Sequence, residues 1–409
     1  MKRPDVVSNN MVVVCIDSPD LKLKGNIMKK INYRRLPAKT LLALVLSSVA
    51  ISGFAETNLI RKPVAVGAYE MVYDTNHHSI FIATTQSRSE EGGVVYELDA
   101  KNLAVIKAIK TGNKPFGAAI NNRTHTAYFG GSIDGSLIAV DMENGKVKGI
   151  LTLVPQTHAK ENPASAHSSA QQEHNDHVGE KQSGEMKRRD DHRPPAPREL
   201  AVDEHTNTVY VSGVNRDDSV LWVVDGNSLT LKQTLKGLGK LNTGLALDSE
   251  SHRLYTSNAD GEFITIDTEA GKIISRSKIL NDGQEHLLMN IALDEKGHRA
   301  FIADNKAATI LVVNIDDGKV IHRINVPESL SVVFNPQRNE IYAAHRNAGG
   351  LSIIDGKTYN LLNTIALPVH PNSLTLAPQE DALFVSVKQE AGHGKPAAAP
   401  DDIVRISLN

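Results

Sequence analysis

The stretch LYTSNADGEFITID, from Leu254 to Asp267, recurs along the chain in altered copies and decides the fold. Its apolar residues alternate on both sides of a turn, which predicts two short neighbouring strands. The second strand ends on an aspartate, Asp267. Six copies carry an aspartate or asparagine at this strand end: Asp99, Asp141, Asp225, Asp267, Asn314 and Asp355. The spacings of 42 residues (99 to 141), 42 (225 to 267) and 41 (314 to 355) are typical of β-propeller blades.

Seven copies fit the chain, at about 69–114, 115–155, 197–240, 241–284, 285–328, 329–370 and 371–409. One blade cannot bury both faces of its own sheet, so neighbouring blades must stack into a common core. The last copy stops after its third strand, and the strand from Arg61 to Val66 can supply the fourth. The sequence predicts an all-β, seven-bladed β-propeller of four-stranded antiparallel blades, with the N-terminal strand closing the last blade.

The N-terminal region has the pattern of a secretory signal. Basic residues follow Met28, an apolar run covers 41–51, and small residues precede a cleavage position after Ala55. We predict a signal peptide at 28–55, a single propeller domain at 56–409, export to the periplasm and no membrane attachment after cleavage. Residues 1–27 precede the second start at Met28 and are interpreted as a non-native extension. The alternative, an uncleaved anchor, is disfavoured by the short apolar run.

Removing residues 1–55 makes the chain more acidic and removes its cysteine. The segment contains nine of the 45 basic residues and three of the 47 acidic residues. The remaining chain has 36 basic and 44 acidic residues, a net charge of −8. The sole cysteine, Cys15, also lies there. The exported domain therefore has no disulfide, no thiolate metal ligand and no cysteine nucleophile, and depends on its core for stability.

One spacing breaks the repeat. Asp141 and Asp225 are 84 residues apart, two periods, with strand patterns for only one blade. The excess, 156–196, is polar and predicts a disordered insert. Imidazoles and carboxylates suit zinc, nickel or copper, and the insert carries five candidate metal ligands: His158, His167, His174, His177 and His192. The alternative is a hydrophilic linker that binds nothing.

Several segments carry a family resemblance. GAYEMVY (67–73), KPFGAAINN (114–122), TGLALDSE (243–250) and HPNSLTLA (370–377) resemble the YncE-type periplasmic propellers of the YVTN-repeat family. The similarity extends over nearly the whole exported part. It implies a seven-bladed, exported, non-enzymatic propeller in a family associated with DNA binding and iron-responsive expression. The His-rich insert departs from the family pattern.

Ligands of propellers usually bind at one end of the central channel, where loops meet. Cations follow a nucleic-acid backbone and aromatic rings stack on its bases, so both residue types at that end predict binding of single-stranded DNA. The candidates are Tyr69, Arg88, Lys114, Phe116, Arg198, Arg216, Lys306, Arg346 and Lys388. Because the domain is net negative, the site must be a locally basic face. The alternative is ordinary loop charges, several paired with nearby acidic residues.

No catalytic set is recognisable. Glu285–His286 and His345–Arg346 are the only adjacent acid–base pairs near blade starts, and neither comes with a nucleophile or a ligand set. We expect a binding protein without enzymatic activity or a resident cofactor. A metal-linked binding protein that uses the insert is the second interpretation, and a propeller lactonase or lyase is a weaker third.

Overall fold

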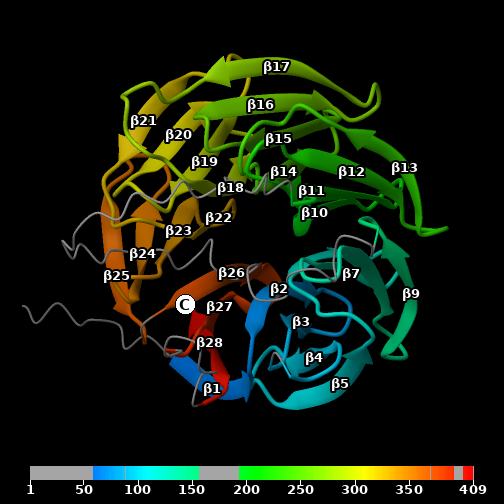
Figure 1. Ribbon diagram of the computed structural model, residues 1–409. Coiled ribbons are helices and arrows are strands. Elements are labelled where there is room, and N and C mark those ends of the chain that lie inside the picture. Colours follow the sequence, from blue (N-terminus) through cyan, green and yellow to red (C-terminus); the bar gives the residue numbers. More distant parts are fainter. Residues whose placement is uncertain (1–58, 88, 156–192, 369, 391–398, 409) are drawn as a thin grey trace, which may run out of the picture. The chain divides into compact units, whose positions relative to one another are not determined.

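The computed structural model describes residues 59–87, 89–155, 193–368, 370–390 and 399–408. The chain divides into two compact units, 1–53 and 54–409, and all described residues belong to the second. Their strands form seven antiparallel four-stranded sheets around a ring (Figure 1). Helix in the described part is limited to the short 3₁₀ turn η2 (Pro378–Glu380). No helix in this part is long and apolar enough to cross a membrane.

Each blade runs outward from an inner strand, and the first three blades follow the chain in order. Blade 1 contains β2 (Ala68–Asp74), β3 (Ser79–Thr84), β4 (Gly93–Asp99) and β5 (Val105–Thr111). Blade 2 contains β6 (Gly117–Asn121), β7 (Thr126–Gly131), β8 (Ser136–Asp141) and β9 (Lys146–Thr152). Blade 3 contains β10 (Ala196–Asp203), β11 (Thr208–Val214), β12 (Val220–Asp225) and β13 (Thr230–Leu235).

The next three blades repeat the arrangement. Blade 4 contains β14 (Leu245–Asp248), β15 (Arg253–Ser257), β16 (Glu262–Asp267) and β17 (Lys272–Lys278). Blade 5 contains β18 (Leu288–Asp294), β19 (Arg299–Asp304), β20 (Ile310–Asn314) and β21 (Val320–Ile324). Blade 6 contains β22 (Ser331–Asn335), β23 (Glu340–His345), β24 (Gly350–Asp355) and β25 (Leu361–Ala366). The inner strands β2, β6, β10, β14, β18, β22 and β26 contact their neighbours in a closed circle.

The seventh blade closes the ring with the N-terminal strand, as predicted. It contains β26 (Pro371–Ala377), β27 (Ala382–Val387), β28 (Asp401–Ser407) and, outermost, β1 (Leu59–Ala65). β1 pairs antiparallel with β28, and the Nε of Arg61 donates to an oxygen of Asp402 at 2.7 Å. Asp401 accepts hydrogen bonds from the backbone of Gly67 and Ala68, both at 2.9 Å, which ties the last blade to the first. Closure completes the last blade, so that β28 is paired on both sides and the blade has four strands like the others.

The repeated aspartates end the third strand of their blades and shape the turn that follows. The Oδ1 of Asp99 accepts hydrogen bonds from the backbone N–H groups of Lys101 and Asn102, both at 2.9 Å. Equivalent bonds to following N–H groups are made by Asp141, Asp225, Asp267, Asn314 and Asp355. These side chains therefore serve as structural turn formers, as expected of this residue type.

The core lies between blades, where the faces of neighbouring sheets meet. Phe81, Phe129, Phe301 and Phe384 are fully buried on second strands. Trp222, on β12, is 4% exposed and packs in one cluster with residues of blades 2 and 3. Truncating a buried aromatic residue of this kind typically costs about 3–5 kcal/mol of stability.

The insert and the N-terminal segments lie outside the described residues. So do the five candidate metal ligands, the signal peptide and the extension, and these remain predictions. The predicted end of the insert, 196, is one residue too late, because Ala196 pairs with Val214 as the first residue of β10.

Candidate functional site at the mouth of the central channel

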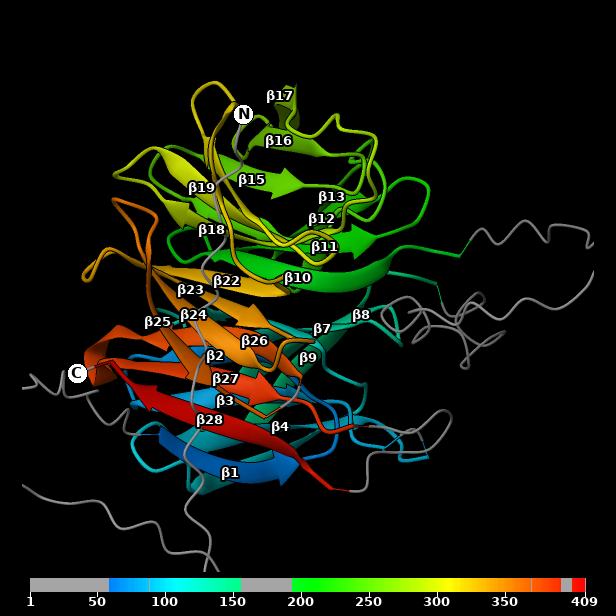
Figure 2. The same ribbon diagram turned by 90° about the vertical axis from the view of Figure 1, so that its left-hand side faces the viewer.

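The order of the strands brings many predicted residues to one end of the ring. In each antiparallel blade, the start of the inner strand lies at the same end as the loop after the second strand. β10 and β28 both begin at this end, on the right of Figure 2. We call this end the mouth of the channel.

Two aromatic rings and two cations form a continuous stack at the mouth, hereafter the cation–aromatic stack. The rings of Tyr69, on β2, and Phe116, just before β6, have centroids 4.0 Å apart. The ammonium of Lys388 lies 3.9 Å from the centre of the Tyr69 ring. The guanidinium carbon of Arg198, on β10, lies 4.4 Å from the centre of the Phe116 ring. Four of the nine predicted residues, from blades 7, 1, 2 and 3, therefore touch in one row.

The two cations of the stack differ in their bonding. The Nζ of Lys388 donates to Asp401 at 2.7 Å and to the carbonyl of Ala68 at 3.2 Å. The guanidinium of Arg198 makes no hydrogen bond to any residue that the structure describes, although its side chain is half-buried. Burial lowers the pKa of Arg198, while the nearby Tyr69 and Glu70 partly restore it. Arg198 is therefore the cation of the stack whose N–H donors are available to a ligand.

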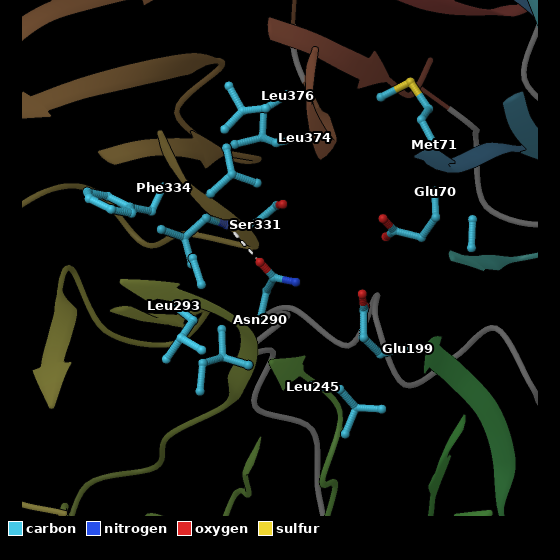
Figure 3. A pocket seen from close by; sticks show the side chains of 15 residues that line it. Glu70, Met71, Glu199, Leu245, Asn290, Leu293, Ser331, Phe334, Leu374 and Leu376 are labelled. Atoms are coloured by element: carbon cyan, nitrogen blue, oxygen red, sulfur yellow. Dashed lines mark hydrogen bonds between the residues drawn. The ribbon is translucent and has the colours of Figure 1, made fainter. Parts of the chain in front are cut away.

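A cavity of about 320 Å³ lies beside the stack, within the channel (Figure 3). Its charged lining residues are Glu70 and Glu199, whose carboxyl groups point toward the same open space. Burial raises the pKa of Glu70, against the opposing effects of its hydrogen bond from Ser373 and the charge of Arg198. Burial and the charge of Glu70 hold the pKa of Glu199 well above its usual range. The two carboxyl groups therefore resist being ionised together.

The repeat pattern, the closed ring and the residues of the mouth can be compared with known proteins. No family model matches the chain. The chain is 45% identical over 375 residues to the uncharacterized protein YncE of Salmonella typhimurium, which covers 91% of this chain and 98% of that protein. YncE of Escherichia coli strain K12 is also 45% identical over 375 residues, with the same coverage. The chain belongs to the YncE family.

Four other predicted cations of this YncE-family chain lie at the mouth without joining the stack. The Nζ of Lys114 donates hydrogen bonds to the carbonyl oxygens of Thr85 and Ser87, at 2.8 and 2.9 Å. Burial lowers the pKa of Lys114, although Asp134 and Glu90 oppose the shift. Arg346 donates to Asn372 at 2.7 Å. Arg216 and Lys306 are exposed on the loops after β11 and β19, and Arg88 lies outside the described residues.

The acid–base pairs noted in the sequence take part in structural networks. The ring nitrogens of His286 lie 2.6 Å from Asp304 and 2.8 Å from Asp282. Burial opposes the charge on His286, but these two carboxylates outweigh it and raise its pKa. His345 lies between the hydroxyls of Ser329 and Ser352, and burial lowers its pKa. Both imidazoles thus already have partners at both nitrogens.

Glu70 and Glu199 are the residues whose place in the site the sequence reasoning missed. They were considered only as partners for nearby cations. A signal was present, because Tyr69–Glu70 and Arg198–Glu199 occupy comparable positions near the starts of two inner strands. Among the described residues, no group of three or more His, Cys, Asp or Glu side chains is arranged to hold a metal ion. The predicted metal site therefore depends wholly on residues outside the described part.

Proposed function

We propose that this YncE-family propeller is an exported, non-enzymatic binding protein that binds single-stranded DNA at the mouth of its channel. The observation that carries the proposal is the Arg198 guanidinium, which is half-buried, rests on Phe116 and has no hydrogen-bond partner among the described residues. A guanidinium presents a planar set of donors that matches a phosphate and binds it with two parallel hydrogen bonds.

The rings of the stack position this guanidinium. Tyr69 and Phe116 lie against each other, and each also has a cation close to its centre. A ring has only two faces, so a base could stack on either ring only by displacing Lys388 or Arg198. We therefore assign phosphate recognition to Arg198 and assign the rings the role of holding it in place. Single-stranded DNA suits such a site, because its flexible backbone can bring one phosphate into a recessed position.

The overall charge of the domain limits the mode of binding. A net charge of −8 after residue 55 repels a polyanion at long range, so attraction must come from the mouth itself. The exposed Arg216 and Lys306 can contact further phosphates along the strand. Binding by phosphate contacts predicts little dependence on base sequence and a strong dependence on salt.

The test is fluorescence anisotropy of a labelled single-stranded oligonucleotide at three salt concentrations, with a duplex of the same sequence for comparison. Arg198→Ala should weaken binding about tenfold or more, because hydrogen bonds to a charged group contribute about 1.5–3 kcal/mol. It should also lower the slope of log affinity against log salt by about 0.7, the value for one phosphate contact on a single strand.

The matched control is Arg323→Ala, which removes the same charge from the exposed outer strand β21. This variant should bind like the wild type. Absence of binding by the wild type at low salt, or equal affinities for all three proteins, would refute the proposed function.

A further inference from the structure

We propose that the channel cavity behind the stack is a binding site for a small organic ammonium ion, held between the carboxyl groups of Glu70 and Glu199. This site is separate from the DNA site of the proposed function. The ligand class is an alkylamine with a second hydrogen-bonding group at its far end, such as a short diamine.

The first argument is the pair of carboxyl groups and what surrounds it. Both groups face the cavity. Residues of β6, β14, β18, β22 and β26 also line it, and none of these lining residues is charged. Arg198 is the other titratable group that acts on the pair, through its charge near Glu70. Glu199 has no hydrogen-bond partner for its carboxyl group in the described part of the chain, and Glu70 has Ser373, whose hydroxyl donates at 2.7 Å. An ammonium supplies both the missing positive charge and three N–H donors.

The opposite wall provides the second argument. Ser331 is 6% exposed, lines the cavity, and its hydroxyl makes no hydrogen bond to a described residue. Asn290 lies beside it, with its Oδ1 fixed by the backbone N–H of Val332 at 3.0 Å, so that its amide is oriented. Nearly buried polar groups normally have a partner, and their orientation toward the cavity points to a polar group of a ligand. A diamine can meet the carboxyl pair with one end and Ser331 with the other.

Size and ligand number favour an organic cation over a metal ion. A volume of about 320 Å³ lies in the range of small-molecule sites. Calcium needs six to eight oxygen ligands and magnesium a near-ideal octahedron, whereas only two carboxylates line this cavity. Apolar side chains such as Leu245, Leu374 and Met71 also line it and can contact the carbon chain of an amine.

Binding should release a proton. In the free protein the two carboxyl groups disfavour joint ionisation, and a bound ammonium between them makes that state favourable. Burial raises the pKa of Glu70 and, together with the charge of Glu70, the pKa of Glu199, so affinity for the amine should rise with pH.

The experiment is isothermal titration calorimetry of the purified protein with 1,4-diaminobutane, in two buffers of different ionisation enthalpy. We expect saturable binding, proton release, and at least about a tenfold loss of affinity in Glu199→Gln and in Glu70→Gln. Glu285→Gln, which removes the same charge from an exposed loop, should bind like the wild type. Both cavity variants should fold, because glutamine has nearly the same shape as glutamate and removes a buried charge.

Three outcomes would overturn the inference. The wild type fails to bind the diamine, 1,4-butanediol binds equally well without a charge, or Mg²⁺ alone binds and loses its affinity in the same two variants. The oligonucleotide assay separates this site from the proposed function. Arg198→Ala should retain diamine binding, and Glu199→Gln should retain oligonucleotide binding, so the failure of either proposal is visible independently.

Discussion

Gly117 is the position where the closest approach of two blades can be tested by adding one carbon atom. A Cβ placed there would lie 1.6 Å from the backbone oxygen of Arg198 and 2.9 Å from the Cδ1 of Leu200. Cβ atoms essentially never lie under 3.0 Å from such neighbours, and a backbone carbonyl cannot rotate away as a side chain can. Gly117→Ala must therefore push β6 and β10 apart, and with them Phe116 and Arg198.

The magnitude follows from this overlap. Overpacking a well-packed interior costs about 1–3 kcal/mol and occasionally more, and a clash with backbone belongs at the upper end of that range. We expect Gly117→Ala to lower the free energy of unfolding by about 3 kcal/mol. Gly112 provides the matched control: its added Cβ would meet only the Cδ1 of Ile150, at 3.4 Å, and its φ is not left-handed. Gly112→Ala should leave stability unchanged or raise it by about 0.4–1 kcal/mol.

The assay is urea unfolding followed by the fluorescence of Trp222, the sole tryptophan, which is buried in blade 3, the blade that contains the affected strand β10. Gly117→Ala should also weaken oligonucleotide binding at the mouth, because the guanidinium of Arg198 loses its position over Phe116. Equal unfolding midpoints for wild type, Gly112→Ala and Gly117→Ala would refute the close approach of these two blades and the positioning argument built on it.

Three further predictions concern other parts of the domain. The raised pKa of His286 means that its bridge to Asp304 contributes stability below the unfolded histidine pKa and loses it as pH rises through the folded value. The hydrogen bond from His286 lowers the pKa of Asp282, so the stability that this carboxylate contributes is lost as the pH falls through its folded pKa. His286→Ala should therefore make the melting temperature depend less on pH in both the acidic and the alkaline range. Asp401→Ala should cost about 3–5 kcal/mol in urea unfolding, because it leaves a nearly buried ammonium and three backbone donors without their acceptor, whereas truncating an exposed aspartate should cost little. Deleting residues 157–192 should abolish zinc or nickel binding measured by calorimetry, and retention of the full affinity would place the metal elsewhere.

The sequence by itself determined the architecture of this protein, because the signals involved are local. A repeat near 42 residues, alternating apolar positions and one turn-forming aspartate per copy specify a blade without reference to any other blade. The missing fourth strand of the last copy was also predicted, from the unassigned strand pattern at Arg61–Val66, and the structure places this strand at Leu59–Ala65. The same signals placed the candidate cations at one end of the ring.

Only the tertiary structure decided which of those residues meet. Lys388 and Tyr69 are more than 300 positions apart and touch because β1 and Asp401 close the ring. The repeat predicts that Arg198 and Phe116 share one end of the channel, but the contact depends on the close packing of β6 against β10. The sequence places Glu199 at a position comparable to that of Glu70, but it does not show that the two carboxyl groups share a cavity. The altered pKa of its carboxyl group arises from burial and from a second glutamate two blades away, which are properties of packing rather than of local order.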